Sequence, residues 1–128
     1  MKVIGLIGDM SWESSAEYYR IIQRAMMAED FSRGRLEERH GLEVLIPDKT
    51  DRDMVHKVIY DELCQGKILE QSKREYLRVM KALADRGASG TILGCTEIQL
   101  LIKPEDSALP VFDTTRIHAE KAVELALS

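Results

Sequence analysis

A single cysteine follows an apolar run in the stretch Gly-Cys-Thr-Glu-Ile, residues 94–98. Thr96 and Gln99 have the spacing of a capping box, so Thr96 is predicted to cap a helix that starts there. The unpaired amides of a helix start attract a substrate carboxylate and favour a thiolate. Cys95 is therefore a candidate acid/base. A cysteine at the end of a buried strand can equally be a small core residue, and this interpretation stays open.

The loop that carries Cys95 lies between a predicted strand and a predicted helix. Three loops have this place in the sequence: residues 8–13, 95–97 and 113–115. In parallel sheets, ligands bind at the carboxyl ends of the strands. We therefore expect the three loops to form one site.

The first of these loops also suggests a dinucleotide-binding turn, because Gly5 and Gly8 precede it. The pattern lacks its third glycine, and Trp12 and Glu13 would crowd a pyrophosphate. Ser11 is more typical of a helix cap than of a nucleophile, since no Gly-x-Ser-x-Gly elbow occurs.

Metal binding is not expected. The only cysteines are Cys64 and Cys95, no Cys-x-x-Cys or His-x-x-x-His spacing occurs, and the three histidines are far apart in the sequence. Two cysteines are also too few for a disulfide framework, which indicates a reducing compartment. Cys64 lies beside Leu63 in a predicted helix, where it is interpreted as a packing residue or a chance occurrence.

Composition excludes several classes of protein. The chain has 128 residues, enough for one compact domain, and a net charge of −4 with no basic block, which argues against nucleic acid or an anionic membrane as partner. The first apolar run is too short for a signal peptide or a membrane span. We expect a soluble, cytoplasmic protein.

Strands alternate with helices along the sequence. Strands are predicted at residues 2–7, 43–48, 91–94 and 109–112, and helices from residue 14 onward and at 50–63, 69–86 and 114–127. This order predicts an α/β fold, a three-layer sandwich with a mainly parallel four-stranded sheet. The last helix is expected to be buried through Ala119, Ala122, Val123 and Ala126.

The first helix is unusual. Its apolar stripe breaks near Ala28, although no stop signal ends it there, and it could extend from about Ser14 to Arg39. Such a helix would be roughly 39 Å long, more than a small domain can cover. Its exposed part, with Met26 and Phe31, would favour a segment-exchanged homodimer.

Three segments together resemble the aspartate/glutamate racemases, a family of cofactor-independent amino-acid racemases: "KVIGLIGDMSWESSAEYYR", "GCTEIQLLI" and "LPVFDTTRIHAEKAVELAL". The middle pieces "EDFSRGRLEERHGLEVLIPD" and "IYDELCQGK" are similar to the second half of such an enzyme. The resemblance covers nearly the whole chain.

The resemblance implies an isomerase of amino-acid metabolism that needs no pyridoxal phosphate or other cofactor and acts on aspartate or glutamate. Two acid/base groups flank Cα in such an enzyme, one removing the proton and one returning it on the opposite face. By resemblance, Cys95 is one of them. Thr96 and Glu97 would hold the amino acid, and Met10 and Ser11 would line the site. Glu97 could instead only favour its own helix dipole.

The chain departs from the family in length, since members are about twice as long. Residues 1–23 resemble the start of the family's first domain and residues 27–128 its second half, so we expect one racemase-like domain over residues 1–128 with an internal deletion. The segment that carries the opposite-face acid/base has no counterpart. The site would then be completed by a second subunit or remain one-sided. The alternative is a non-catalytic module that binds small carboxylates and forms the exchanged dimer.

Overall fold

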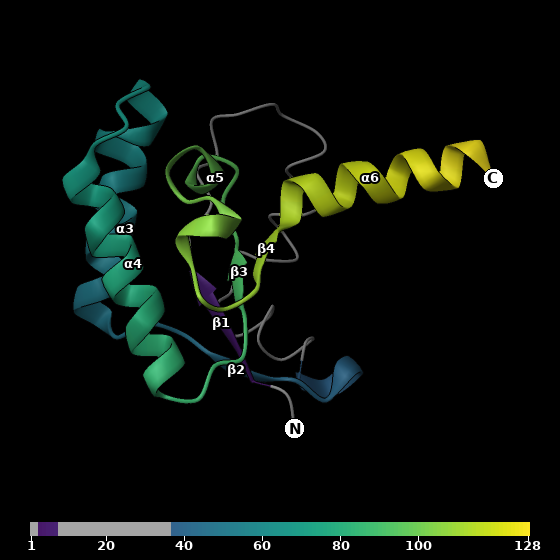
Figure 1. Cartoon of the computed structure of the whole chain (residues 1–128), viewed down its shortest axis with the longest axis horizontal. Helices are drawn as coiled ribbons and strands as arrows, with labels where there is room; N and C mark the ends of the chain where they lie inside the picture. Colours follow the sequence, from purple (N-terminus) through teal and green to yellow (C-terminus); the bar gives the residue numbers. More distant parts are fainter. Residues whose placement is uncertain (1–2, 8–36) are drawn as a thin grey trace.

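The computed structural model describes the backbone of residues 3–7 and all of residues 37–128. Its sheet has four strands: β1 (Val3–Ile7), β2 (Glu43–Leu45), β3 (Thr91–Leu93) and β4 (Val111–Asp113). They lie in the order β2-β1-β3-β4, and every pairing is parallel (Figure 1). The predicted α/β class and parallel sheet are confirmed.

Two long helices connect β2 to β3 and lie side by side on one side of the sheet (Figure 1): α3 (Lys49–Asp61) and α4 (Glu70–Asp85). The side chain of Asp48 caps α3 by accepting a hydrogen bond from the Asp51 amide at 2.9 Å. Gly66, with φ 72°, ends the short 3-10 helix η1 (Leu63–Gln65) that follows α3. The glycine stops predicted at Gly66 and Gly87 are both left-handed, as the helix ends require.

The core lies between these helices and the sheet, where the apolar stripes of α3 and α4 meet β3. Its most deeply buried side chains are Ile59, Tyr76, Val79, Leu83, Leu93, Ile98 and Ile102. Tyr76 is fully buried, and its hydroxyl donates a hydrogen bond to the Val55 carbonyl oxygen at 2.9 Å. This bond joins the two helices and satisfies a polar group inside the core.

A short segment links β3 to β4. It holds α5 (Ile98–Leu101) and the 3-10 helix η2 (Pro104–Asp106), and α5 contacts η1. Lys73 of α4 forms an ion pair with Asp106 of η2 at 2.8 Å. This pair fixes the segment after α5 to the helical layer.

The last helix, α6 (Thr114–Leu127), has the predicted bounds but not the predicted burial. The expected stripe of Ala119, Ala122, Val123 and Ala126 is exposed along its whole length. Figure 1 shows α6 projecting from the end of β4, away from α3 and α4. Periodicity identifies the side chains that could be buried, but no described element lies against them. The third layer expected from α6 is therefore not formed by this helix.

Two expectations concern residues outside the described part of the chain. The long first helix falls there except for residues 37–40, which are helical and end at Gly41 with φ 61°. Met10 and Ser11 also lie outside the described residues. Within the described ranges, none of the helices has the length and apolar character needed to cross a bilayer.

Candidate functional site

The turn between β3 and α5 carries Cys95, directly beyond the carboxyl end of a central strand. The Cys95 side chain is only 4% exposed and belongs to the core cluster that also contains Tyr76 and Ile98. Its carbonyl oxygen accepts a hydrogen bond from the Ile98 amide at 3.2 Å, which closes the turn. The core interpretation of this cysteine therefore describes its packing correctly.

The sulfur of Cys95 also has a polar partner. Cys95 Sγ donates a hydrogen bond to Glu97 Oε2 at 2.8 Å, and the Thr96 hydroxyl donates to the same oxygen at 2.8 Å. A carboxylate at this position stabilises the protonated thiol as a donor and is placed to accept its proton. The three residues thus form one hydrogen-bonded group, which we call the thiol turn (residues 95–97).

The predicted capping box at Thr96 and Gln99 is wrong. The cap position of α5 is Glu97, with helical backbone angles and no side-chain capping bond, and the Thr96 hydroxyl points to Glu97 instead. The helix that follows has four residues, because the chain turns away before Pro104. The short α5 therefore offers Cys95 little helix dipole, and Glu97 is the hydrogen-bond partner of its thiol.

Tyr76 lies on the core side of this turn. Burial raises the pKa of its hydroxyl far above the ordinary value, and the nearby Cys95 and Glu62 raise it further. The tyrosine therefore stays neutral and acts as a fixed donor to the Val55 carbonyl. Tyr76 therefore packs in the core beside Cys95 and does not act as an acid.

The third predicted loop, residues 113–115, lies beside the thiol turn because Leu93 and Asp113 are partners in the sheet register. The Thr114 hydroxyl donates to the Leu93 carbonyl oxygen at 3.0 Å, which ties the two strand ends together. Asp113 caps α6 by accepting from the amides of Thr115 and Arg116. Two of the three predicted loops thus meet at one edge, and the loop at residues 8–13 is outside the described residues.

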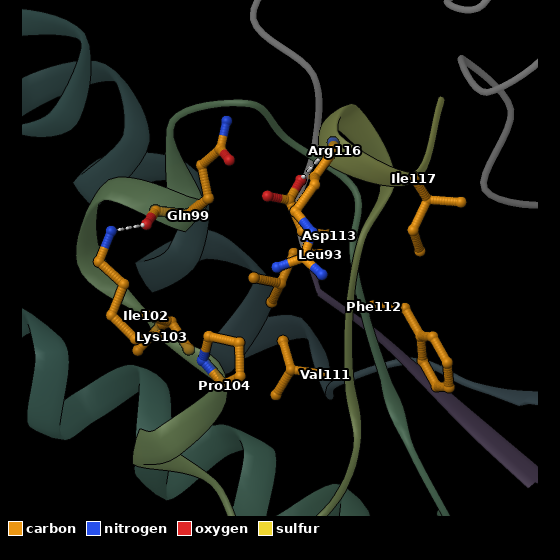
Figure 2. A pocket seen from close by; sticks show the side chains of 10 residues that line it. All are labelled: Leu93, Gln99, Ile102, Lys103, Pro104, Val111, Phe112, Asp113, Arg116 and Ile117. Carbon is orange, nitrogen blue, oxygen red and sulfur yellow. Dashed lines mark hydrogen bonds between the residues drawn. The ribbon is translucent and has the colours of Figure 1, made fainter. Parts of the chain in front are cut away.

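A pocket of about 530 Å³ opens next to this edge, between α5 and the start of α6 (Figure 2). Its polar lining comes from Gln99, Lys103, Asp113 and Arg116, and Cys95 is not part of it. Its apolar lining is Leu93, Ile102, Pro104, Val111, Phe112 and Ile117. Figure 2 shows Lys103 bonded to the Gln99 carbonyl oxygen, at 2.6 Å, on the side of the pocket opposite Phe112 and Ile117.

Sequence reasoning did not identify the two cations of this pocket. Lys103 follows a helix of only four residues, and Arg116 lies in the first turn of α6, so neither belongs to a motif. The sequence indicates them only through their positions: Lys103 comes a few residues after the loop at residues 95–97, and Arg116 directly follows the loop at residues 113–115.

Cys64, interpreted from the sequence as a packing residue or a chance occurrence, is exposed in η1, so the packing interpretation is wrong. The described part of the chain contains no group of three or more metal-ligating side chains close enough to hold an ion.

Comparison with known proteins agrees with the fold. The model of the Asp/Glu/hydantoin racemase family matches residues 28–122. The crystal structure of an assigned Asp/Glu racemase from Yersinia pestis is 46% identical, with a TM-score of 0.80, and that of an aspartate racemase homologue from Pyrococcus horikoshii is 31% identical, with a TM-score of 0.77. Both alignments cover 99% of this chain and 49% of the solved one, so the chain spans about half the length of these proteins.

The parallel α/β sheet of this chain is thus shared with the two solved relatives. The chain belongs to the Asp/Glu/hydantoin racemase family.

Proposed function

We propose that this chain removes the Cα proton of an acidic amino acid, aspartate or glutamate, with Cys95 as the acid/base and without pyridoxal phosphate. The observation that carries the proposal is the hydrogen bond between Cys95 Sγ and Glu97 Oε2. A cysteine with only a packing role needs no carboxylate partner. Membership of a racemase family supports the same reaction.

The proposed chemistry has two proton transfers. The Sγ proton first passes to the Glu97 carboxylate, which leaves a thiolate. The thiolate then takes the proton from Cα, and the electron pair of the broken C–H bond spreads onto the substrate carboxylate. Donors near that carboxylate stabilise the developing charge, and the Thr96 hydroxyl is one candidate.

The binding residues of the proposal are Thr96 and Glu97 in the thiol turn, with Met10 and Ser11 from the loop at residues 8–13. Glu97 would serve mainly the sulfur, because one of its oxygens already accepts two hydrogen bonds. Because Cys95 is almost fully buried, we propose that the substrate reaches the sulfur when the thiol turn moves outward. The two free thiols fit a reducing compartment such as the cytoplasm.

The proposed site acts on one face of the substrate. The family match begins at residue 28, and the solved relatives are about twice as long, which supports a join between residues 1–23 and 27–128 in one racemase-like domain. The only other cysteine, Cys64, is exposed in η1. A single chain would therefore exchange the Cα proton with solvent and return it from the same side.

Deuterium uptake tests this proposal. The protein is incubated with aspartate or glutamate in D2O, and the loss of the Cα proton signal is followed by NMR. We expect uptake by the wild type and by Cys64→Ser, and none above background by Cys95→Ser. Uptake that survives Cys95→Ser would show that the sulfur is not the base.

A second candidate function is a module that binds small carboxylates without turnover, which the burial of Cys95 favours. In that case aspartate would bind in calorimetry, with no deuterium uptake by any variant. Absence of both binding and uptake would contradict both candidates.

A further inference from the structure

The pocket between α5 and the start of α6 is lined by none of the residues of the thiol turn, and the proposed reaction does not use it. Its volume of about 530 Å³ lies in the range of sites for small organic molecules. Its deep wall is apolar, because Leu93 and Ile102 line it and are only 2% and 1% exposed. Val111 of the edge strand β4 continues this wall. The pocket can therefore cover a compact hydrocarbon group.

Two cations on the polar side of the pocket keep donors for a ligand. Lys103 Nζ donates a hydrogen bond to the Gln99 carbonyl oxygen, and an ammonium has three hydrogens to donate. Arg116 pairs with Glu120 of its own helix through Nε, at 2.9 Å, and its terminal amino groups carry its other four hydrogens. Figure 2 shows the end of the Arg116 side chain turned back from α6 toward Leu93. Both cations are thus placed to bind a carboxylate.

A carboxylate lies beside these cations. Asp113 Oδ1 accepts hydrogen bonds from the amides of Thr115 and Arg116 and so caps α6. Its other oxygen takes no part in this cap, and Figure 2 shows it on the side that faces Gln99. Asp113 can therefore keep its structural role and still accept a hydrogen bond from a ligand ammonium.

The balance of charge selects the kind of ligand. Asp113 and Glu120 together offset Lys103 and Arg116, so the site is close to neutral while it presents both signs. A zwitterion matches this arrangement better than a simple anion, which would leave Asp113 opposed by its own charge. The deep wall offers no cation, so a second carboxylate there would lose its hydration without a partner.

We propose that this pocket binds the zwitterion of an amino acid with an apolar side chain. The ligand carboxylate accepts hydrogen bonds from Arg116 and Lys103, and the ligand ammonium donates to Asp113. The ligand side chain lies against Leu93 and Ile102. This inference does not depend on the reaction proposed at Cys95, and it gives the chain a second ligand site with a different side-chain preference.

Calorimetry with three matched compounds tests the ligand class. Phenylalanine carries both charges, 3-phenylpropanoate lacks the ammonium, and 2-phenylethylamine lacks the carboxylate. We expect phenylalanine to bind, with a Kd of about 1 mM or below, and each of the other two to bind about tenfold more weakly, as for loss of one charged hydrogen bond. Absence of phenylalanine binding at about 10 mM would overturn the proposal. Equal binding of phenylalanine and 3-phenylpropanoate would overturn the zwitterion.

Two substitutions test the assigned contacts. Arg116→Gln should weaken phenylalanine binding about tenfold, whereas Arg74→Gln should not change it. Arg74 is the matched control, because it also pairs with a glutamate four positions away and is similarly exposed, but lies in α4. Asp113→Asn keeps a capping side chain and should weaken binding of phenylalanine but not of 3-phenylpropanoate. Equal effects of the two arginine substitutions, or of Asp113→Asn on the two ligands, would overturn the contacts.

NMR titration of the labelled protein tests the location. Phenylalanine should shift the amide signals of residues 99–104 and 111–117, and it should do so equally in Cys95→Ser. Shifts confined to residues 95–97, or displacement of phenylalanine by aspartate, would place the ligand at the thiol turn and overturn the second site. Failure of deuterium uptake would leave these results unchanged, so the two proposals can fail separately.

Discussion

The thiol of Cys95 donates a hydrogen bond to Glu97 Oε2 at 2.8 Å, within a turn that Thr96 also supports through the same oxygen. The two residues are separated by one position, so the geometry depends on the turn between β3 and α5 and not on distant parts of the chain. The arrangement gives the thiol hydrogen a defined acceptor. In the proposed reaction, Glu97 is therefore as important as the cysteine.

Replacing Glu97 with glutamine should leave the turn folded and remove the acceptor for the thiol proton. We expect the rate of Cα deuterium uptake to fall by about 100-fold, as for loss of one acid/base group. The rate should also begin to rise with pH, because hydroxide must then remove the thiol proton. Glu105→Gln, an exposed glutamate in η2, is the matched control and should keep the wild-type rate. An unchanged rate in Glu97→Gln would remove Glu97 from the mechanism.

The two thiols should differ in reactivity. Cys64 is exposed and Cys95 is 4% exposed, so a thiol reagent such as DTNB should modify one sulfur quickly and the second slowly. Only the slow phase should disappear in Cys95→Ser. Two fast phases in the wild type would mean that the thiol turn is open in solution.

The hydroxyl of Tyr76 should contribute to stability rather than to chemistry. Tyr76→Phe removes its bond to the Val55 carbonyl, which keeps its place in the hydrogen-bond ladder of α3, so the expected cost is about 0.5–1.5 kcal/mol. For a chain of this size, each kcal/mol corresponds to a fall in Tm of about 4 °C. Thermal unfolding by circular dichroism measures the change. A variant as stable as the wild type would contradict the assigned role of the bond.

The ion pair between Lys73 and Asp106 predicts a pH dependence. The Lys73 ammonium, with the Lys103 amide, holds the pKa of Asp106 below its usual value. A carboxyl whose pKa is lower in the folded state adds stability above its unfolded pKa, near 4, and that stability is lost as the pH falls through the folded value. Asp106→Asn should thus be less stable than the wild type at pH 6, and the difference should shrink at an acidic pH below the unfolded pKa.

Urea unfolding at the two pH values checks this, and Asp85→Asn is the control. Asp85 also forms an ion pair, with Lys81 at 2.7 Å, but its side chain is 65% exposed, whereas that of Asp106 is 18% exposed. Exposed pairs contribute little, so Asp85→Asn should be nearly neutral at both pH values. Equal effects of the two substitutions at pH 6 would contradict the structural role of Asp106.

Much of the fold could be predicted from the sequence because local signals and global packing agree. Gly66 and Gly87 end helical segments where the left-handed backbone requires glycine, and the stripes of α3 and α4 enclose the core as their spacing predicts. The burial of α6 could not be predicted in this way. A helical pattern specifies which side chains can be covered, whereas covering them depends on another surface that the pattern does not describe.

The candidate site was predictable only in its position. The alternation of strands and helices placed Cys95 at a strand end, which β3 confirms. The partner of the sulfur was not predictable, because the capping-box spacing of Thr96 and Gln99 assumes a helix that starts one residue earlier. When the helix starts at Ile98, the Thr96 hydroxyl and the Glu97 carboxylate turn toward each other and toward the thiol.

The most direct test of the central claim is the stereochemistry of deuterium uptake, measured separately on the L and D forms of aspartate by NMR and chiral chromatography. A single base at Cys95 predicts uptake into one enantiomer, with retention of configuration and with complete dependence on the sulfur. Formation of the opposite enantiomer at the rate of deuterium uptake would contradict the one-sided site, because it requires a second acid/base group on the other face of Cα.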